Sequence, residues 1–125
     1  MTGRILVVDD VATNRIVMKV KLASACYDVD QADCGAAALF AARQLLPDLI
    51  LLDVLMPDMS GLDVCRQLKS DADTADIPVI LITALADRES KMAGLEAGAD
   101  DFLTKPVDEV TLLARVRSLL RARDT

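Results

Sequence analysis

The chain of 125 residues contains no histidine and no tryptophan, and it has one tyrosine and two phenylalanines. Without histidine, neither an imidazole acid–base catalyst nor a cysteine–histidine nucleophile can form. The three cysteines are odd in number and none are spaced as C-x-x-C, so a zinc site of cysteine and histidine ligands is excluded as well. We expect these cysteines to be reduced thiols of a cytoplasmic protein.

Long apolar runs and an excess of positive charge are also missing. The longest apolar stretches are far shorter than the roughly 20 residues of a membrane-spanning helix. The first four residues pass directly into an apolar run, without the pattern of a signal peptide. The formal net charge of −6 disfavours contact with nucleic acid phosphates. The sequence therefore predicts a cytoplasmic protein that binds neither a membrane nor nucleic acid.

The chain does contain short apolar runs with β-branched residues, which alternate with helical segments and are typical of a parallel sheet. The predicted strands are 4–9, 27–32, 49–53, 79–83 and 101–104. The predicted helices are 13–25, 35–46, 61–70, 87–97 and 108–121, with Thr13 or Asn14, Ser60 and Asp108 as N-caps and Gly98 after the fourth helix. This alternation predicts one α/β domain, a doubly wound sheet with helices on both faces.

Four of the apolar runs end on residues that suit phosphoryl chemistry. Asp9 and Asp10 follow the first strand, Asp53 ends the third, Thr83 ends the fourth, and Lys105 follows the fifth. The carboxyl ends of parallel strands share one edge, so these side chains are predicted to converge. Clustered carboxylates are typical ligands of Mg²⁺, and an aspartate beside Mg²⁺ can attack a phosphoryl group.

The remaining two side chains can bind the phosphoryl oxygens, Thr83 through its hydroxyl and Lys105 through its charge. Pro106 follows the lysine directly. A cis peptide at this X–Pro bond would fix the direction of Lys105.

Four motifs together resemble the signature of two-component response regulator receiver domains, over essentially the whole chain. They are VVDD at 7–10, LDVLMP at 52–57 with Gly61, ITA at 82–84, and GADDFLTKP at 98–106. The resemblance implies a flavodoxin-like, CheY-like fold, with a five-stranded parallel sheet in the order 2-1-3-4-5.

The same resemblance implies a role for each of these residues. Asp53 would be the phosphoacceptor, charged by a histidine kinase or a phosphotransfer protein. Asp9, Asp10, Asp53 and the backbone carbonyl of Leu55 would hold Mg²⁺, for which Mn²⁺ can substitute. Thr83 and Lys105 would stabilise the phosphoryl group, and Phe102 would complete the switch by packing alone.

Leu55 and Leu85 occupy the two positions that tune hydrolysis in this family, two residues after the phosphoacceptor and two after the threonine. Both are apolar, so neither can orient an attacking water. The sequence therefore predicts slow self-dephosphorylation.

More narrowly, the chain resembles the first receiver of PleD-type diguanylate cyclases, through LITAL at 81–85, DFLTKP at 101–106 and LARVRSL at 113–119. This implies a receiver excised from a longer regulator of cyclic-di-GMP signalling, with a stand-alone receiver as the alternative. The mixed charges of the 87–123 face predict a self-complementary homodimer, and an ordinary solvated surface is the alternative.

Other classes of function fit the residues less well. A phosphohydrolase of the haloacid dehalogenase type needs a second aspartate two residues after the nucleophile, where this chain has Leu55. A flavodoxin-type cofactor site needs a phosphate cradle, and the loop at 9–14 has no glycine. A receiver that acts as a phosphorylation-independent interaction module stays open. We therefore expect a phosphoacceptor without catalytic output of its own.

Overall fold

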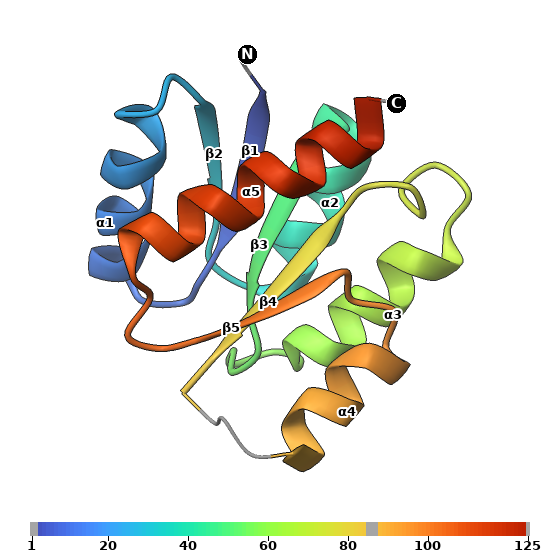
Figure 1. The fold of residues 1–125 in the computed structure, drawn as a ribbon. Helices are drawn as coiled ribbons and strands as arrows, with labels where there is room; N and C mark the ends of the chain where they lie inside the picture. Colours follow the sequence, from blue (N-terminus) through green and yellow to red (C-terminus); the bar gives the residue numbers. More distant parts are fainter. Residues whose placement is uncertain (1–2, 85–87, 125) are drawn as a thin grey trace.

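Five parallel strands form the centre of the molecule, in the order β2-β1-β3-β4-β5 (Figure 1). The computed structural model describes residues 3–84 and 88–124, apart from the side chains at 88, 90, 123 and 124. The strands are β1 (Arg4–Val8), β2 (Asp28–Ala32), β3 (Leu49–Asp53), β4 (Val79–Thr83) and β5 (Asp101–Thr104). The predicted strand order and parallel pairing are confirmed.

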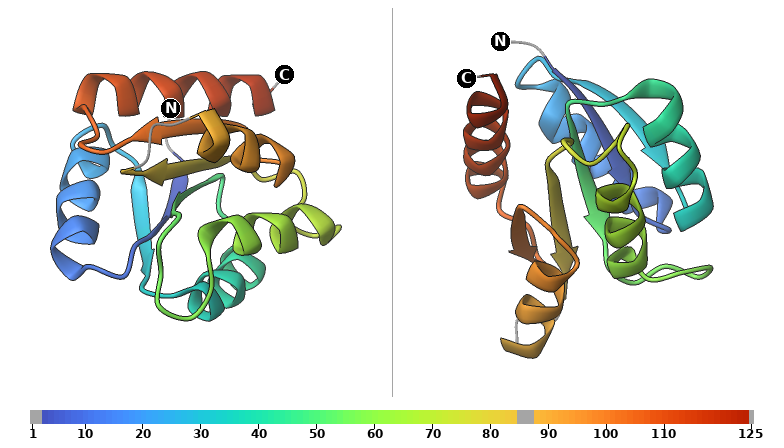
Figure 2. Two further views of the ribbon diagram at one scale, coloured as in Figure 1. Left: turned by 90° about the horizontal axis from the view of Figure 1, so that it is seen from below. Right: turned by 90° about the vertical axis from the view of Figure 1, so that its right-hand side faces the viewer.

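The helices lie on both faces of this sheet, as predicted (Figure 2). They are α1 (Ala12–Ala23), α2 (Gly35–Leu45), α3 (Gly61–Ser70), α4 (Arg88–Glu96) and α5 (Glu109–Asp124). Leu22 of α1 and Leu112 of α5 belong to the core cluster on one face. Ala38 of α2 and Val64 of α3 belong to the cluster on the other, which also includes Ala97 just after α4. Among the described residues, no helix has the length and apolar composition needed to cross a membrane.

The burial of each strand follows its place in the sheet. Every residue of β3 and β4 is buried, because helices cover both of their faces. β2 lies at the edge and exposes Asp28 and Gln31, and its polar side chains limit edge-to-edge pairing. The alternating polarity along β2 is typical of such an edge position.

The helix ends differ in places from the prediction. α1 begins at Ala12 with Val11 at the N-cap and no side-chain cap, so the predicted capping by Thr13 or Asn14 is wrong. The Asp9 carboxylate instead accepts a hydrogen bond from Val11 N at 2.9 Å, which starts the helix earlier. Ser60 caps α3 and Asp108 bonds the first turn of α5, as predicted. α5 continues three residues beyond the predicted end at 121, and the predicted start of the fourth helix at residue 87 lies outside the described residues.

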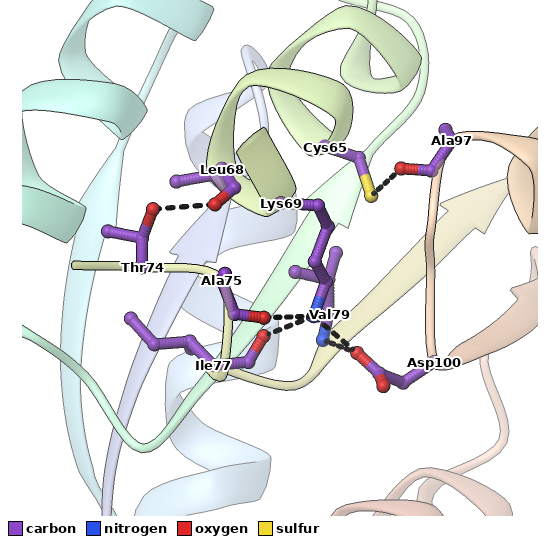
Figure 3. Close-up of polar contacts among 9 residues, drawn as sticks. All are labelled: Cys65, Leu68, Lys69, Thr74, Ala75, Ile77, Val79, Ala97 and Asp100. Atoms are coloured by element: carbon purple, nitrogen blue, oxygen red, sulfur yellow. Dashed lines mark hydrogen bonds and ion pairs between the residues drawn. The ribbon is translucent and has the colours of Figure 1, made fainter. Parts of the chain in front are cut away.

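One largely buried lysine joins α3 to the loops that precede β4 and β5 (Figure 3). The ammonium of Lys69, whose side chain is 18% exposed, donates to Ala75 O at 3.2 Å, to Ile77 O at 2.7 Å and to the Asp100 carboxylate at 2.9 Å. The same carboxylate accepts from Val79 N at 2.8 Å. Lys69 therefore provides hydrogen-bond donors to three acceptors in the loops before β4 and β5, which would otherwise depend on water.

We expect Lys69→Met to lower the free energy of unfolding by about 2 kcal/mol, since it leaves a carboxylate and two carbonyls without their cation. Urea unfolding measures this difference. Arg66→Met on the same helix is the control, because the Arg66–Asp63 pair is half exposed and such pairs contribute about 0–1 kcal/mol. Equal losses for the two variants would contradict the role assigned to Lys69.

Candidate functional site

The polar residues predicted to converge do meet at the carboxyl edge of the sheet. Asp9 directly follows β1, Asp53 is the last residue of β3, and Thr83 is the last residue of β4. Lys105 directly follows β5, and its backbone N–H donates to Thr83 O at 2.7 Å. The four strands that position these residues, β1, β3, β4 and β5, are adjacent in the sheet. Residues up to about a hundred positions apart in the sequence therefore share one site.

Three carboxylates form the acidic part of the site. Asp9, Asp10 and Asp53 each offer an oxygen, and these oxygens all lie within 4.8 Å of one another. Asp53 is 5% exposed and Asp9 is 7% exposed, whereas Asp10 lies at the surface. Burial, and then the negative charge of Asp9, raise the pKa of Asp53, and the nearby Lys105 opposes this increase. The fold thus holds Asp53 where its charged form needs a positive partner.

Lys105 supplies one such charge. Its ammonium lies 3.2 Å from Asp53 Oδ1 and 3.7 Å from Asp9 Oδ2, and its side chain is about one-third exposed. The Lys105–Pro106 peptide bond is cis. One ammonium against three carboxylates leaves an excess of negative charge. Hard oxygen ligands with excess negative charge are the donor set that Mg²⁺ and Mn²⁺ prefer, so the residues present fit such an ion.

The backbone around Asp9 is held by several hydrogen bonds. Asp9 N donates to Ala32 O of β2 at 3.1 Å, and the guanidinium of Arg15 donates to Asp9 O at 2.7 Å. Arg15 also donates to the side chain of Gln31 at 3.3 Å. Arg15 was not among the predicted site residues, because nothing in the spacing of a helical arginine indicates which carbonyl it reaches.

The loop between β3 and α3 returns close to the strand it leaves. Gly61 N donates to Val54 O at 2.7 Å, and Val54 N donates to Ile82 O at 3.0 Å. Leu55, two residues beyond Asp53, is 63% exposed. The other predicted hydrolysis-tuning residue, Leu85, lies outside the described residues.

The two predicted switch residues lie on neighbouring strands. Thr83 is 2% exposed at the end of β4, and Phe102 is half buried on β5, where it pairs in register with Leu81. A methyl group built on Gly94 of α4 would lie 3.2 Å from the Phe102 ring, so the ring packs directly against the backbone of α4. A change in the position of this ring would therefore act on α4.

A cavity of about 250 Å³ borders the site between α1, the sheet and the loop after β5. Asp9, Asp53 and Lys105 line one end of it. The rest of the lining is mainly apolar and includes Val7, Val17, Met18, Leu51, Ile82 and Val107. The cavity leaves space beside the carboxylates on the α1 side of the sheet.

Comparison with known proteins agrees with this geometry. The family model of the response regulator receiver domain matches residues 5–117 of this chain. Response regulator PleD of Caulobacter vibrioides is 55% identical over 121 residues, which are 97% of this chain and 27% of PleD. The DNA-binding dual master transcriptional regulator RpaA of Synechocystis sp. is 47% identical over 97% of this chain and 50% of its own length. The chain therefore spans half or less of these two relatives.

Solved structures are similar over nearly the whole chain. A putative response regulator from Chloroflexus aurantiacus has a TM-score of 0.92 and 35% identity, covering 97% of this chain and 99% of its own. The signal receiver domain of a signal transduction histidine kinase from Syntrophus aciditrophicus has a TM-score of 0.90 and 42% identity, covering 96% and 91%. The chain therefore belongs to the response regulator receiver domain family of two-component signalling.

Proposed function

We propose that this receiver accepts a phosphoryl group on Asp53. The observation that carries the proposal is the position of Asp53, buried at the end of β3, grouped with two further carboxylates and 3.2 Å from the Lys105 ammonium. A carboxylate oxygen of Asp53 attacks the phosphorus of a donor phosphohistidine, the phosphorus–nitrogen bond breaks, and the imidazole leaves. The product is an acyl phosphate on Asp53.

The negative charge of the carboxylates and of the incoming phosphoryl group requires positive partners. Asp9, Asp10, Asp53 and the Leu55 carbonyl would hold Mg²⁺ or Mn²⁺, which when bound supplies positive charge to the phosphoryl oxygens. Lys105 exchanges its bond to the Asp53 carboxylate for one to a phosphoryl oxygen, and its ammonium stays close to its present place. Thr83 donates its hydroxyl to another phosphoryl oxygen, and Phe102 then changes its packing against α4.

A small phosphodonor tests the proposal directly. Acetyl phosphate is added with Mg²⁺ or with EDTA, and intact mass followed by peptide mapping locates the adduct. We expect one phosphoryl group, dependent on Mg²⁺, on the peptide that contains Asp53. An adduct on another residue would overturn the assignment. If no adduct forms with acetyl phosphate or with a phosphorylated donor protein, the chain acts as a phosphorylation-independent interaction module.

The donor protein is expected to approach over α1. Val11, Ile16 and Val20 are 46%, 57% and 64% exposed on or just before this helix, and other residues of the helix line the cavity that borders Asp53. Receiver domains take their phosphoryl group from histidine kinases or phosphotransfer proteins. Exposed apolar residues on a helix that borders the site suit contact with a protein surface of this kind.

Leu55 is expected to keep the acyl phosphate long-lived. Its aliphatic side chain follows Asp53 by two residues and cannot orient an attacking water. Leu55→Asn is therefore expected to speed the loss of the phosphoryl group by about tenfold, through a polar group able to position that water. The decay of the intact-mass adduct measures both rates. A wild-type rate equal to or faster than that of the variant would contradict this prediction.

Pairing of two chains through the 87–123 face is a further part of the proposal. Met92 and Leu95 of α4 are 50% and 67% exposed on this face, although residue 87 and the side chain at 123 lie outside the described residues. The Arg115 guanidinium already binds Asp101 of the same chain at 2.9 and 3.0 Å, so a dimer through these charges needs this pair to exchange partners. A phosphorylated sample that sediments as a monomer at high concentration would contradict the dimer.

The chain is also proposed to be one receiver of a longer regulator. Its relatives support this, since it spans 27% of PleD and 50% of RpaA. An output in cyclic-di-GMP signalling follows only if the longer protein carries a cyclase. Sequencing the gene beyond codon 125 tests both statements.

A further inference from the structure

Asp58 is an acidic residue outside the cluster of carboxylates, and it joins two parts of the chain that are distant in sequence. It lies in the loop between β3 and α3, and its carboxylate accepts from Gly35 N at 2.8 Å and from Ala36 N at 2.9 Å. Gly35 and Ala36 are the first two residues of α2. These backbone hydrogen bonds lower the pKa of Asp58, because they stabilise its charged form.

The helix needs this remote partner because its own cap is weak. Cys34 occupies the N-cap of α2, and its sulfur accepts from Ala37 N at 3.5 Å. Cysteine is not among the side chains that cap helices well, whereas a carboxylate at an N-terminus also interacts favourably with the helix dipole. Asp58 therefore supplies the capping that the local sequence lacks.

Packing reinforces the same contact. A methyl group on Gly35 would overlap the side chain of Met59, the residue next to Asp58. The loop lies so close to the start of α2 that only glycine fits there without moving Met59. Asp58 and Met59 together hold the loop between β3 and α3 against the N-terminus of α2.

The other end of this loop is equally constrained. Gly61 N donates to Val54 O at 2.7 Å, and Ser60 caps α3 through Leu62 N. The segment 55–60 is thus held at α2 through Asp58 and at β3 through Gly61. Leu55, whose carbonyl is assigned to the ion under the proposed function, lies in this segment.

We infer that Asp58 is a positioning residue for the divalent cation, because it uses the N-terminus of α2 to hold the loop that carries the Leu55 carbonyl. The inference rests on the proposed function. Both oxygens of Asp58 already accept backbone hydrogen bonds, so its part is to orient the loop and not to bind the ion. Residues that orient metal ligands typically change metal affinity by about 10- to 100-fold when they are replaced.

The test compares Mg²⁺ binding to the wild type, Asp58→Ala, Asp58→Asn and the control Asp63→Asn, by isothermal titration calorimetry well below each melting temperature. Asp58→Ala is expected to raise the dissociation constant by about tenfold. Asp58→Asn keeps one acceptor oxygen and should recover part of this loss. Asp63→Asn removes the same charge from an exposed position on α3, and its dissociation constant for Mg²⁺ should stay within about twofold of the wild-type value. This variant measures the long-range electrostatic contribution.

Amide hydrogen exchange at the start of α2 separates orientation from simple helix capping. Faster exchange at Gly35 and Ala36 with unchanged Mg²⁺ affinity would overturn the inference, because Asp58 would then act on α2 alone. Equal weakening in Asp58→Ala and Asp63→Asn would also overturn it, in favour of net charge. If the wild type itself does not bind Mg²⁺, the proposed function fails, and the inference fails with it. If Asp58→Ala does not fold, Asp58→Asn carries the comparison.

Discussion

Asp53→Asn is expected to abolish phosphorylation by acetyl phosphate and to raise the stability of the metal-free protein. The amide of asparagine is not a nucleophile, so no acyl phosphate forms and the mass of the variant should not change. The stability increases because the substitution removes a charge that is 5% exposed and repelled by Asp9. We expect a gain of about 1 kcal/mol, or about 4 °C in melting temperature.

The dependence on pH has a definite sign. The pKa of Asp53 lies above its ordinary value of 3.8, so the folded chain retains a proton that the unfolded chain releases. The contribution of Asp53 to stability is therefore greatest at low pH and decreases as the pH rises from about 3.8 through the folded pKa. The gain from Asp53→Asn should follow the opposite course and be largest at neutral pH.

Added Mg²⁺ should reverse the order of the two proteins. A ligand that binds only the folded state increases the free energy of unfolding by RT ln(1 + [L]/Kd). The variant has lost one of the three carboxylates of the cluster, so it should gain less from Mg²⁺ than the wild type does. Thermal unfolding with and without Mg²⁺ measures this effect. Asp63→Asn, an equal change of charge at the surface, should keep both the adduct and the response to Mg²⁺. A phosphoryl adduct on Asp53→Asn, or a metal-free melting temperature below that of the wild type, would contradict the role of Asp53.

Gly61→Ala is expected to destabilise the protein even more than Lys69→Met does. A methyl group on Gly61 would overlap the backbone carbonyl oxygen of Asp53 and would lie 2.8 Å from Val54 Cα. Both obstacles are backbone atoms, so no side chain can rotate away and β3 must separate from the start of α3. Overpacking of this kind destabilises by about 3 kcal/mol.

The same substitution should slow phosphorylation, because the carbonyl it displaces belongs to Asp53. Urea unfolding measures the stability, and the rate of adduct formation from acetyl phosphate measures the site. Gly3→Ala is the matched control, since its methyl group would meet the nearest atom, on Leu120, at 3.4 Å, an ordinary contact. Losses of less than about 1 kcal/mol for Gly61→Ala, or equal losses for the two variants, would contradict this prediction.

Much of the fold could be predicted because the burial of a strand follows from its local amino-acid composition. β3 and β4 are continuous apolar runs, and a run of this kind is stable only with helices on both faces. The convergence of Asp9, Asp53, Thr83 and Lys105 followed from the same reasoning, since parallel strands end at one edge. The start of α1 could not be predicted in this way, because Asp9, a residue of the site, bonds Val11 N and competes with the local caps.

The amino-acid sequence by itself determined the class of fold, the strand order through its family signature, and the residue types gathered at the carboxyl edge of the sheet. Only the tertiary structure decided which of them touch, because side-chain reach and burial depend on neighbours from other elements. Lys105 lies nearer to Asp53 than to Asp9, Arg15 binds the Asp9 carbonyl, and Asp58 caps a helix more than twenty residues before it. Hydrogen bonds between distant segments form only after the sheet has brought those segments together, so no local pattern encodes them.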